Sequence, residues 1–287
     1  MKAIYKKEVK SYLTSMIGYV FIFFILLLEG IYFTAYNLQN AYPLFGTTLS
    51  AVTFIFLILV PVLTMKTIAE ERKQKTDQLL LTAPVSVSEI VLGKFLAVAT
   101  VYAIPVLIIC LYPVIMGKYG TVSYAMAYTA VLGFALLGFA QIAVGVFWSS
   151  VTENPVIAAV VTFIVLFVCY MITGIGSLIP DSSMASLACY MLLVLLAAVW
   201  IYHMIRNLWI AAVIGIAGEA ALAITYVVKS TLFEGSIQKF LSVFDITSHF
   251  DNFTNGILDL QGVVYFLSVI IIFLVLTVQT ITKRRWN

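Results

Sequence analysis

Long apolar stretches separated by short polar segments dominate the chain. A helix that crosses a bilayer needs about 20 predominantly apolar residues, and runs of that length recur along the sequence. The pattern therefore predicts an all-α polytopic membrane protein in which residues 1–287 form a single transmembrane domain. The predicted spans are residues 18–38, 48–65, 91–116, 122–149, 155–179, 185–203, 208–228 and 262–282.

The first residues of the chain follow a different pattern. Tyr5 and Tyr12 belong to an apolar set at spacings of three and four, while Lys7 and Lys10 lie on the opposite side of the same helix. This arrangement is typical of an amphipathic helix that lies on the membrane surface, and it predicts such a helix over residues 1–17. The alternative is a plain basic tail in front of the first span.

The distribution of lysine and arginine predicts the orientation in the membrane, because these residues are preferred in short cytoplasmic segments. If the N-terminus is cytoplasmic, the outer side keeps only Lys118, Lys229 and Lys239. Both termini are therefore predicted to be cytoplasmic, since eight spans return the chain to the same side. The basic residues then on the cytoplasmic side are Lys2, Lys6, Lys7, Lys10, Lys66, Arg72, Lys73, Lys75, Lys94, Arg206, Lys283, Arg284 and Arg285.

Two segments in the second half of the chain differ from the other spans. Only residues 203–207 separate the sixth and seventh spans, so residues 185–228 are expected to form a helical hairpin added to a six-span core. Residues 229–261 form the one long outer loop, in which Ile237 and Phe240 begin an apolar pattern with helical spacing. We expect an amphipathic helix there, which serves either as a structural rim or as a gate.

The longest polar interruption is residues 66–94, between the second and third spans. Its dense charges must lie outside the bilayer core. The second span is expected to continue as a charged surface helix and to break near Pro84, because the residue before a proline is biased away from helix. Ser86 or Ser88 is the expected N-cap of the next helix, with Glu89 in its first turn. The segment is either a rigid connection to two spans or an ordinary charged loop.

Composition agrees with a membrane protein and excludes other classes. The chain is 63% hydrophobic and 10% charged, with a mean hydropathy of +1.09, which is too apolar for a soluble domain. A net charge of +3 spread over 16 basic residues says little about partners. The three cysteines lie inside apolar runs, so neither disulfides nor a metal site is expected. The first apolar run lacks a cleavage site and is expected to stay as an anchor.

Catalytic motifs are missing from the sequence. The two histidines, His203 and His249, are predicted on opposite sides of the membrane and cannot share a site. The chain has no phosphate-binding glycine loop, no metalloprotease helix and no serine nucleophile elbow. We therefore expect no enzyme activity, no metal and no directly bound cofactor.

Two carboxylates lie within predicted spans, Glu29 in the first and Glu219 in the seventh. An ionised carboxylate at the bilayer centre costs roughly 2.5–3.5 kcal/mol on insertion scales. Each carboxylate is therefore expected to face protein, water or a partner. Glu29 is a candidate for a substrate path and equally for a structural group, whereas a structural role is favoured for Glu219.

The polar stretch at residues 66–94 resembles the signature of permease subunits of type 2 ABC transporters, the exporter class. Residues 149–155 and 244–286 are similar to the gliding-motility-type subgroup. The resemblance covers most of the chain and is weakest at the sixth and seventh spans. Its motif elements are Glu70, Glu71 and Arg72, then Lys75 and Thr76, the leucines at residues 79–81, Pro84, and Gly93 with Lys94.

One position departs from the family pattern. Lys75 stands where the family usually has glycine before Thr76. The departure predicts a longer and straighter helix at this point, because glycine would otherwise favour a helix end.

The resemblance implies a division of labour between subunits. ATP and Mg²⁺ would be bound by a separate ATPase subunit, and two permease subunits, either identical or related, would form the substrate path in the bacterial plasma membrane. Residues 66–90, which we call the coupling region, would dock on the ATPase. An extracytoplasmic accessory subunit is a further candidate partner, whereas nucleic acid is not expected. The implied ATPase contacts are Glu70, Glu71, Arg72, Lys73, Lys75, Thr76, Thr152, Glu153 and Asn154, with Pro84, Gly93 and Lys94 at the turn and the start of the third span.

Two other classes of function stay open at this level. An ATP-independent channel or secondary transporter should show interrupted spans in matched halves, and no convincing internal repeat is present. A membrane scaffold or sensor would not need the coupling region. The transported substrate is not indicated, because the 20 Phe and 16 Tyr fit lipid or peptide export but are also common at membrane interfaces.

Overall fold

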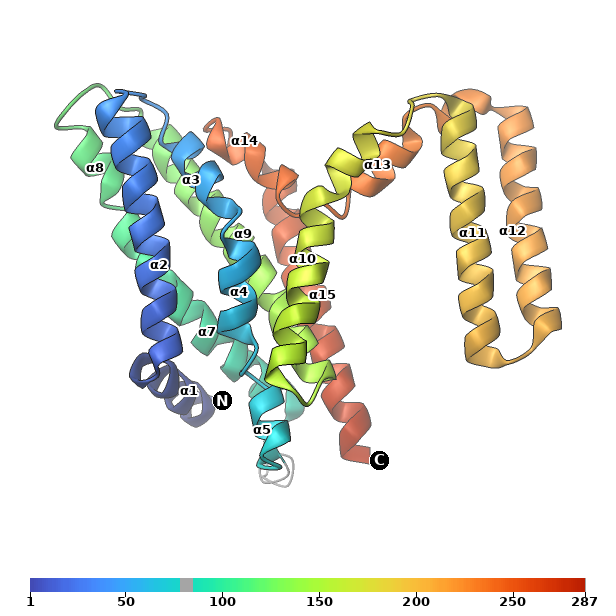
Figure 1. Ribbon diagram of the computed structural model, residues 1–287, viewed down its shortest axis with the longest axis horizontal. Coiled ribbons are helices and arrows are strands. Elements are labelled where there is room, and N and C mark those ends of the chain that lie inside the picture. The colour runs from blue at the N-terminus through green and yellow to red at the C-terminus, as the bar shows by residue number, and fades with distance from the viewer. Residues whose placement is uncertain (78–84, 287) are drawn as a thin grey trace. The chain divides into compact units, whose positions relative to one another are not determined.

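The computed structural model describes residues 1–77 and 85–286, and the regular structure within these ranges is entirely helical (Figure 1). Among the described residues, six helices are long and apolar enough to cross a membrane, or up to eight spans if each of two bent helix pairs counts as one. The predicted all-α polytopic class is therefore confirmed. The predicted number of eight spans requires both bent pairs to cross.

Four of the six continuous candidate spans are single helices. The other two contain a change of helix type or a short break, because η1 extends α2 as a π-helix and α8 follows α7. The elements are α2 (Met16–Tyr32) with η1 (Phe33–Gln39), α7 (Val87–Ile109) with α8 (Tyr112–Met116), α9 (Tyr124–Val151), α10 (Pro155–Ser177), α11 (Ser183–Ile205) and α15 (Leu260–Trp286).

The second predicted span is not a straight helix. It consists of α3 (Phe45–Thr53) and α4 (Phe56–Thr64), which meet at an angle of 60°. The other bent pair joins α12 (Leu208–Val228) to the segment made of η2 (Ser230–Phe233) and α13 (Ser236–Ser242), at 116°. Hydropathy alone does not reveal such bends, because both arms are apolar.

The chain divides into two compact units, residues 1–168 with 246–287 and residues 169–245. In the larger unit α9 is the central helix, and it contacts α15, α3, α4 and α7. Within its apolar 18-residue stretch, 72% of the residues are buried. Gly138 and Gly145 allow this packing, because a Cβ at either position would overlap Tyr102 of α7 or Thr64 of α4. Glycines on the predicted fourth span thus bring neighbouring helices into close contact.

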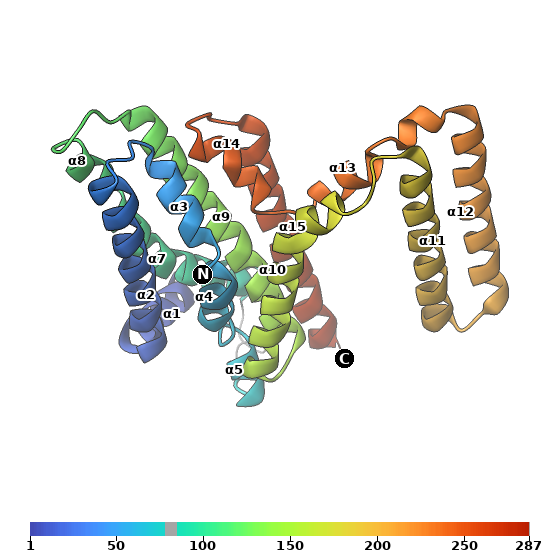
Figure 2. The same cartoon turned by 45° about the horizontal axis from the view of Figure 1, so that its top comes forward.

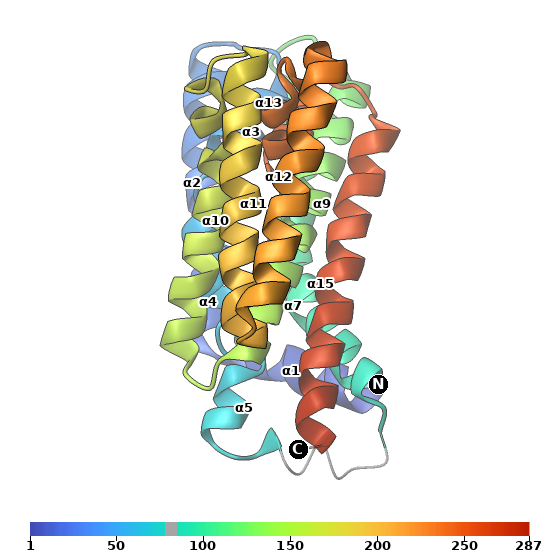
Figure 3. The same cartoon turned by 90° about the vertical axis from the view of Figure 1, so that its right-hand side faces the viewer.

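Both ends of the larger unit have additional short helices. The N-terminal helix α1 (Lys2–Thr14), α5 (Ala69–Lys73) and the last residues of α15 lie together at one end (Figures 1 and 3). At the opposite end, η3 (Ser248–Phe250) and α14 (Asp251–Thr254) lie beside α9 and the start of α15 (Figure 2). Phe250 and Phe253 are fully buried there, against Gly133 of α9, so this part of the segment before α15 is anchored to the core.

The smaller unit is built on a hairpin of α11 and α12, which run side by side (Figure 3). The hairpin turn is made by Arg206, in a left-handed conformation with φ of 56°, and by Asn207, whose side chain accepts from the Trp209 backbone N–H at 3.0 Å. Gln238 of α13 donates to the Ile179 carbonyl at 2.9 Å and thereby holds α13 to the chain after α10. Within the apolar 18-residue stretch of α11, only 6% of the residues are buried.

Candidate functional site

The coupling region contains a short helix, α5, that is separated from α4 by a turn at residues 65–68. The prediction that the second span continues directly into the charged helix is therefore wrong. The first backbone N–H groups of a helix have no partner within it, and Ile68 at the N-cap of α5 has no side-chain acceptor. Ser149 of α9 replaces that acceptor: its hydroxyl accepts from the N–H groups of Ile68 and Ala69, both at 3.1 Å, and donates to the Met65 carbonyl at 3.1 Å.

The helix α5 ends in a tight turn rather than continuing. Lys75 adopts a left-handed conformation with φ of 56°, its N–H donates to the Arg72 carbonyl at 3.0 Å, and the Thr76 N–H donates to the Glu71 carbonyl at 2.9 Å. These two bonds form a Schellman motif, in which the residue at the Lys75 position is most often glycine. The expectation of a longer, straighter helix is wrong, because the capping bonds hold even a lysine in the conformation that glycine prefers.

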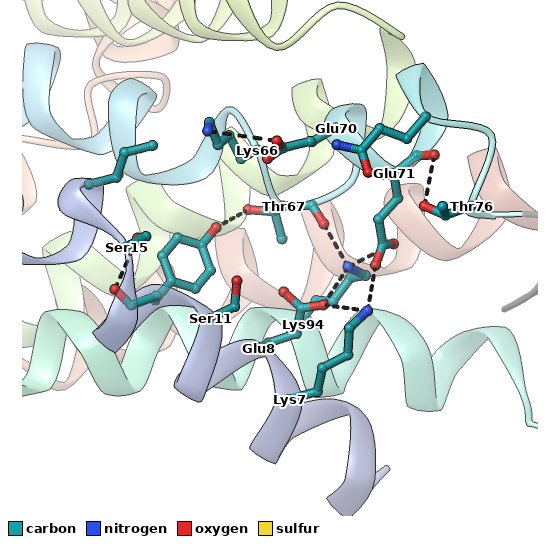
Figure 4. Close-up of a pocket in the computed structure, with 13 residues that line it drawn as sticks. Lys7, Glu8, Ser11, Ser15, Lys66, Thr67, Glu70, Glu71, Thr76 and Lys94 are labelled. Carbon is teal, nitrogen blue, oxygen red and sulfur yellow. Dashed lines mark hydrogen bonds and ion pairs between the residues drawn. The ribbon is translucent and has the colours of Figure 1, made fainter.

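A buried cluster of charges connects α5 to two other helices (Figure 4). Lys94 of α7 is 2% exposed. Its ammonium donates to Glu8 of α1 at 3.0 Å and to the Thr67 carbonyl at 2.7 Å, and it forms an ion pair with Glu71 of α5 at 2.9 Å. The buried ammonium therefore has two carboxylates and one carbonyl within 3.0 Å. Lys7 balances the second carboxylate, at 3.3 Å from Glu71 and 3.9 Å from Glu8. We call Lys7, Glu8, Glu71 and Lys94 the charge cluster.

The charge cluster lies beside a pocket of about 700 Å³ between α1 and the turn that precedes α5 (Figure 4). Tyr12 forms part of the pocket wall, and its hydroxyl donates to the Leu63 carbonyl and pairs with the Thr67 hydroxyl, both at 3.1 Å. Burial raises the pKa of Tyr12 above its usual value, with a smaller contribution from the nearby carboxylate of Glu8. The phenol therefore stays protonated and links α1 to the end of α4.

Arg72 holds the opposite side of α5 to α9. Its side chain is 7% exposed, and Nη1 donates to the Ser150 carbonyl and, at 3.1 Å, to the Thr152 carbonyl. Both carbonyls belong to the C-terminal end of α9, where a positive charge is favoured by the helix dipole. Together with Ser149, this contact makes α9 the third helix fixed to α5.

The predicted site residues thus fall into three groups by their exposure to solvent. Arg72, Lys94 and Gly93 are buried, and a Cβ at Gly93 would lie 3.3 Å from Ile4 of α1. Lys73, Lys75 and Thr76 are exposed, and so are Glu153, which pairs with Arg284 at 3.3 Å, and Asn154, which caps α10. Glu70 and Thr152 are half-buried, with Glu70 3.7 Å from Lys66. Pro84 lies outside the described residues.

Sequence reasoning missed four residues of this site: Lys7 and Glu8 of the charge cluster, Ser149 and Thr67. Glu8 offered a signal, because it stands three residues after Tyr5 and four before Tyr12, on the otherwise apolar side of α1. A carboxylate on the buried face of a surface helix predicts a cationic partner. Ser149 offered no such signal, because its partners are backbone groups of another segment.

The two intramembrane carboxylates are not part of this site. Glu29 in α2 is completely buried, and neither of its oxygens has a hydrogen-bond partner among the described residues. The carboxylate oxygens of Glu219 in α12 are likewise buried and unpaired within the described part of the chain.

Within residues 1–77 and 85–286, no group of three or more His, Cys, Asp or Glu side chains could hold a metal ion. Cys110, Cys169 and Cys189 are free thiols.

Comparison with known protein families gives one match. Residues 29–281 match the family described as ABC-2 family transporter protein. Comparisons with curated proteins and with solved structures give no match. Membrane domains of this kind typically lack ATPase activity of their own, and membership in general implies an ATPase partner. Since the match covers most of the chain, the protein belongs to the ABC-2 family of transporter proteins.

Proposed function

We propose that the protein is the transmembrane permease subunit of an ATP-driven exporter, of the gliding-motility-type subgroup, in the bacterial plasma membrane. Two permease subunits form the substrate path, and each is coupled to a separate ATPase subunit through residues 66–90. The observation that carries the proposal is the attachment of α5. Lys73 of this helix is exposed, whereas Glu71 is held to Lys94 of α7, and Arg72 and the start of the helix are held to α9.

This attachment makes physical sense for coupling. A movement imposed on α5 is transmitted to α7 and α9 because the contacts that join them are buried, and buried ion pairs are costly to break. The end of α4 follows through the chain itself. Three membrane helices therefore respond to one short surface helix, which suits a rigid-body response to closure of a soluble partner.

The exposed face of α5 supplies the docking chemistry. Lys73 and Lys75 are exposed cations on the same short segment, while Glu70 is half-buried beside them. Charged residues at the rim of an interface steer association and fix its register. The proposed docking face is therefore predominantly basic and complements acidic side chains of the ATPase.

Purification from native membranes tests the proposal. The tagged permease is expected to bring down an ABC ATPase, whose ATP hydrolysis is then measured in the reconstituted complex. The double variant Lys73→Glu with Lys75→Glu should lose ATPase binding without loss of thermal stability, because both side chains are exposed. The control is Lys6→Glu with Lys10→Glu, which makes the same charge change on exposed positions of α1.

Four outcomes separate the candidates. Loss of ATPase binding in the α5 variant but not in the α1 variant supports coupling through α5. Equal behaviour of the two variants contradicts it. Absence of any copurified ATPase, together with substrate flux that does not depend on ATP, would favour a channel or secondary transporter, and no flux at all would favour a scaffold.

A further inference from the structure

The side of α1 that faces away from the protein carries positive charge without a counter-charge. Lys2, Lys6 and Lys10 follow one another at intervals of four residues, so they form a row along one side of the helix. All three side chains are exposed, and among the described residues none of them forms an ion pair or a side-chain hydrogen bond. Lys7 does not belong to this row, because it pairs with Glu71. We call Lys2, Lys6 and Lys10 the lysine ridge.

The acidic and aromatic residues of α1 have their partners within the protein. Glu8 is the only carboxylate of this helix, and it is 8% exposed and bound to Lys94. Tyr12 is 6% exposed, and the Tyr5 hydroxyl pairs with the Thr100 hydroxyl of α7 at 2.9 Å. The lysines therefore dominate the surface that α1 presents outward, and no residue of the helix compensates their charge.

The lysine ridge lies beside the start of a membrane span. Ser15 is extended, with φ of −92° and ψ of 149°, so α1 ends there and lies across the end of α2, whose span begins at Met16 (Figures 1 and 3). Met16 and Tyr19 of α2 are 80% and 61% exposed, and Leu96 of the neighbouring α7 is 39% exposed. Exposed apolar residues of a span face lipid, and tyrosine is enriched at the bilayer surface. The lysine side chains are therefore at the level of the lipid headgroups.

We propose that the lysine ridge binds the headgroups of anionic phospholipids in the adjoining membrane leaflet. A lysine ammonium is a compact charge on a flexible stem, which suits headgroups in a fluid layer better than a ligand of fixed shape. Each lysine near an anionic membrane surface strengthens the attachment about fivefold. Lipid is favoured over an acidic protein as the partner, because the exposed residues that adjoin the ridge, Met16 and Tyr19, belong to a membrane span.

Native mass spectrometry of the purified protein in a non-ionic detergent tests this inference. The probes are dioleoyl phosphatidylglycerol and dioleoyl phosphatidylcholine, which have the same acyl chains and differ in the net charge of the headgroup. The wild type should bind phosphatidylglycerol at least about tenfold more tightly, and this preference should shrink as the ionic strength rises, because salt screens exposed charges. The triple variant Lys2→Gln, Lys6→Gln, Lys10→Gln should lose most of the preference.

Two further variants separate the position of the charges from net charge and from packing. Lys118→Gln, Lys229→Gln, Lys239→Gln removes three exposed lysines that do not lie on one helix side, and it should keep the preference. Replacement of the ridge lysines by arginine keeps their charge and should also keep it. If the wild type shows no preference for phosphatidylglycerol, or if the two glutamine variants behave alike, the inference is overturned.

Binding of an ATPase distinguishes lipid from an acidic protein partner. The glutamine variant of the lysine ridge should bring down as much ATPase as the wild type, because its partner is lipid. If this variant loses ATPase binding and keeps its preference for phosphatidylglycerol, the ridge binds the ATPase and the lipid inference fails while the proposed function stands. If the lipid preference depends on the ridge but no ATPase binds to any variant, the lipid inference stands and the proposed function fails.

Discussion

Replacement of Lys94 by methionine tests the structural role of the charge cluster. Methionine has a similar length, so it fills the space of the lysine stem but removes the ammonium that contacts Glu8, Glu71 and the Thr67 carbonyl. The two carboxylates would then face each other with only Lys7 to compensate them. We expect a large loss of stability, because an uncompensated charge would remain in a largely buried position.

The magnitude follows from the burial of the partners. Removal of one partner from a buried ion pair costs about 3–5 kcal/mol. The side chain of Lys94 is 2% exposed, but those of Glu8 and Glu71 are 11% and 16% exposed, and water can reach them in part. Because Lys7 also stays within 3.3 Å of Glu71, we expect the lower end of the range, about 3 kcal/mol.

The assay is unfolding of the purified permease in mixed micelles, with tryptophan fluorescence as the readout. The control is Lys66→Met, which breaks a pair at 3.7 Å whose side chains are 42% and 37% exposed and should cost less than about 0.5 kcal/mol. The triple variant Lys94→Met, Glu8→Gln, Glu71→Gln should recover more than half of the loss. A loss below about 1 kcal/mol for Lys94→Met, the range of exposed pairs, would refute the reasoning.

Three further predictions concern single positions. Lys75→Gly should raise the unfolding free energy by about 1 kcal/mol, because φ of 56° costs a residue with a Cβ; a loss of stability in the same assay would contradict the Schellman turn. Ser149→Ala should lower the unfolding free energy by about 2 kcal/mol, because the Ile68 and Ala69 N–H groups at the start of α5 lose their acceptor. Ser150→Ala should lower it by less than half as much, because the Ser150 hydroxyl donates to a carbonyl of its own helix. Glu29→Gln should leave stability within about 0.5 kcal/mol, because no hydrogen bond to the carboxyl is lost among the described residues; unchanged export by this variant would exclude Glu29 from the substrate path.

The amino-acid sequence alone was sufficient to predict the helical class and several helix ends. Helix class follows from apolar runs of bilayer length, since hydrocarbon leaves the backbone no partners except its own. Ser86 is confirmed as the N-cap of α7, where its hydroxyl accepts from the Glu89 N–H at 3.3 Å. The start of α10 at Pro155 is also confirmed. These features are predictable because the interactions that create them join residues within one turn of helix.

Features that depend on distant segments were not predictable in this way. Glu8 and Lys94 are 86 positions apart, and Arg72 reaches carbonyls about 80 positions later. A local pattern can mark Glu8 as a residue that needs a cation, but it does not identify Lys94 as the partner, because only the packed bundle brings the two groups together and removes both from water.

The coupling region shows the division most clearly. Its charges, its glycine-to-lysine departure at Lys75 and its resemblance to an exporter signature were all visible in the sequence. Which charges face water and which hold the helix in place was settled by packing, because Glu71 and Arg72 are neighbours in the chain yet bind α7 and α9 on different sides of α5. A five-residue helix is too short to be stable alone, so its ends and its orientation come from the three membrane helices around it.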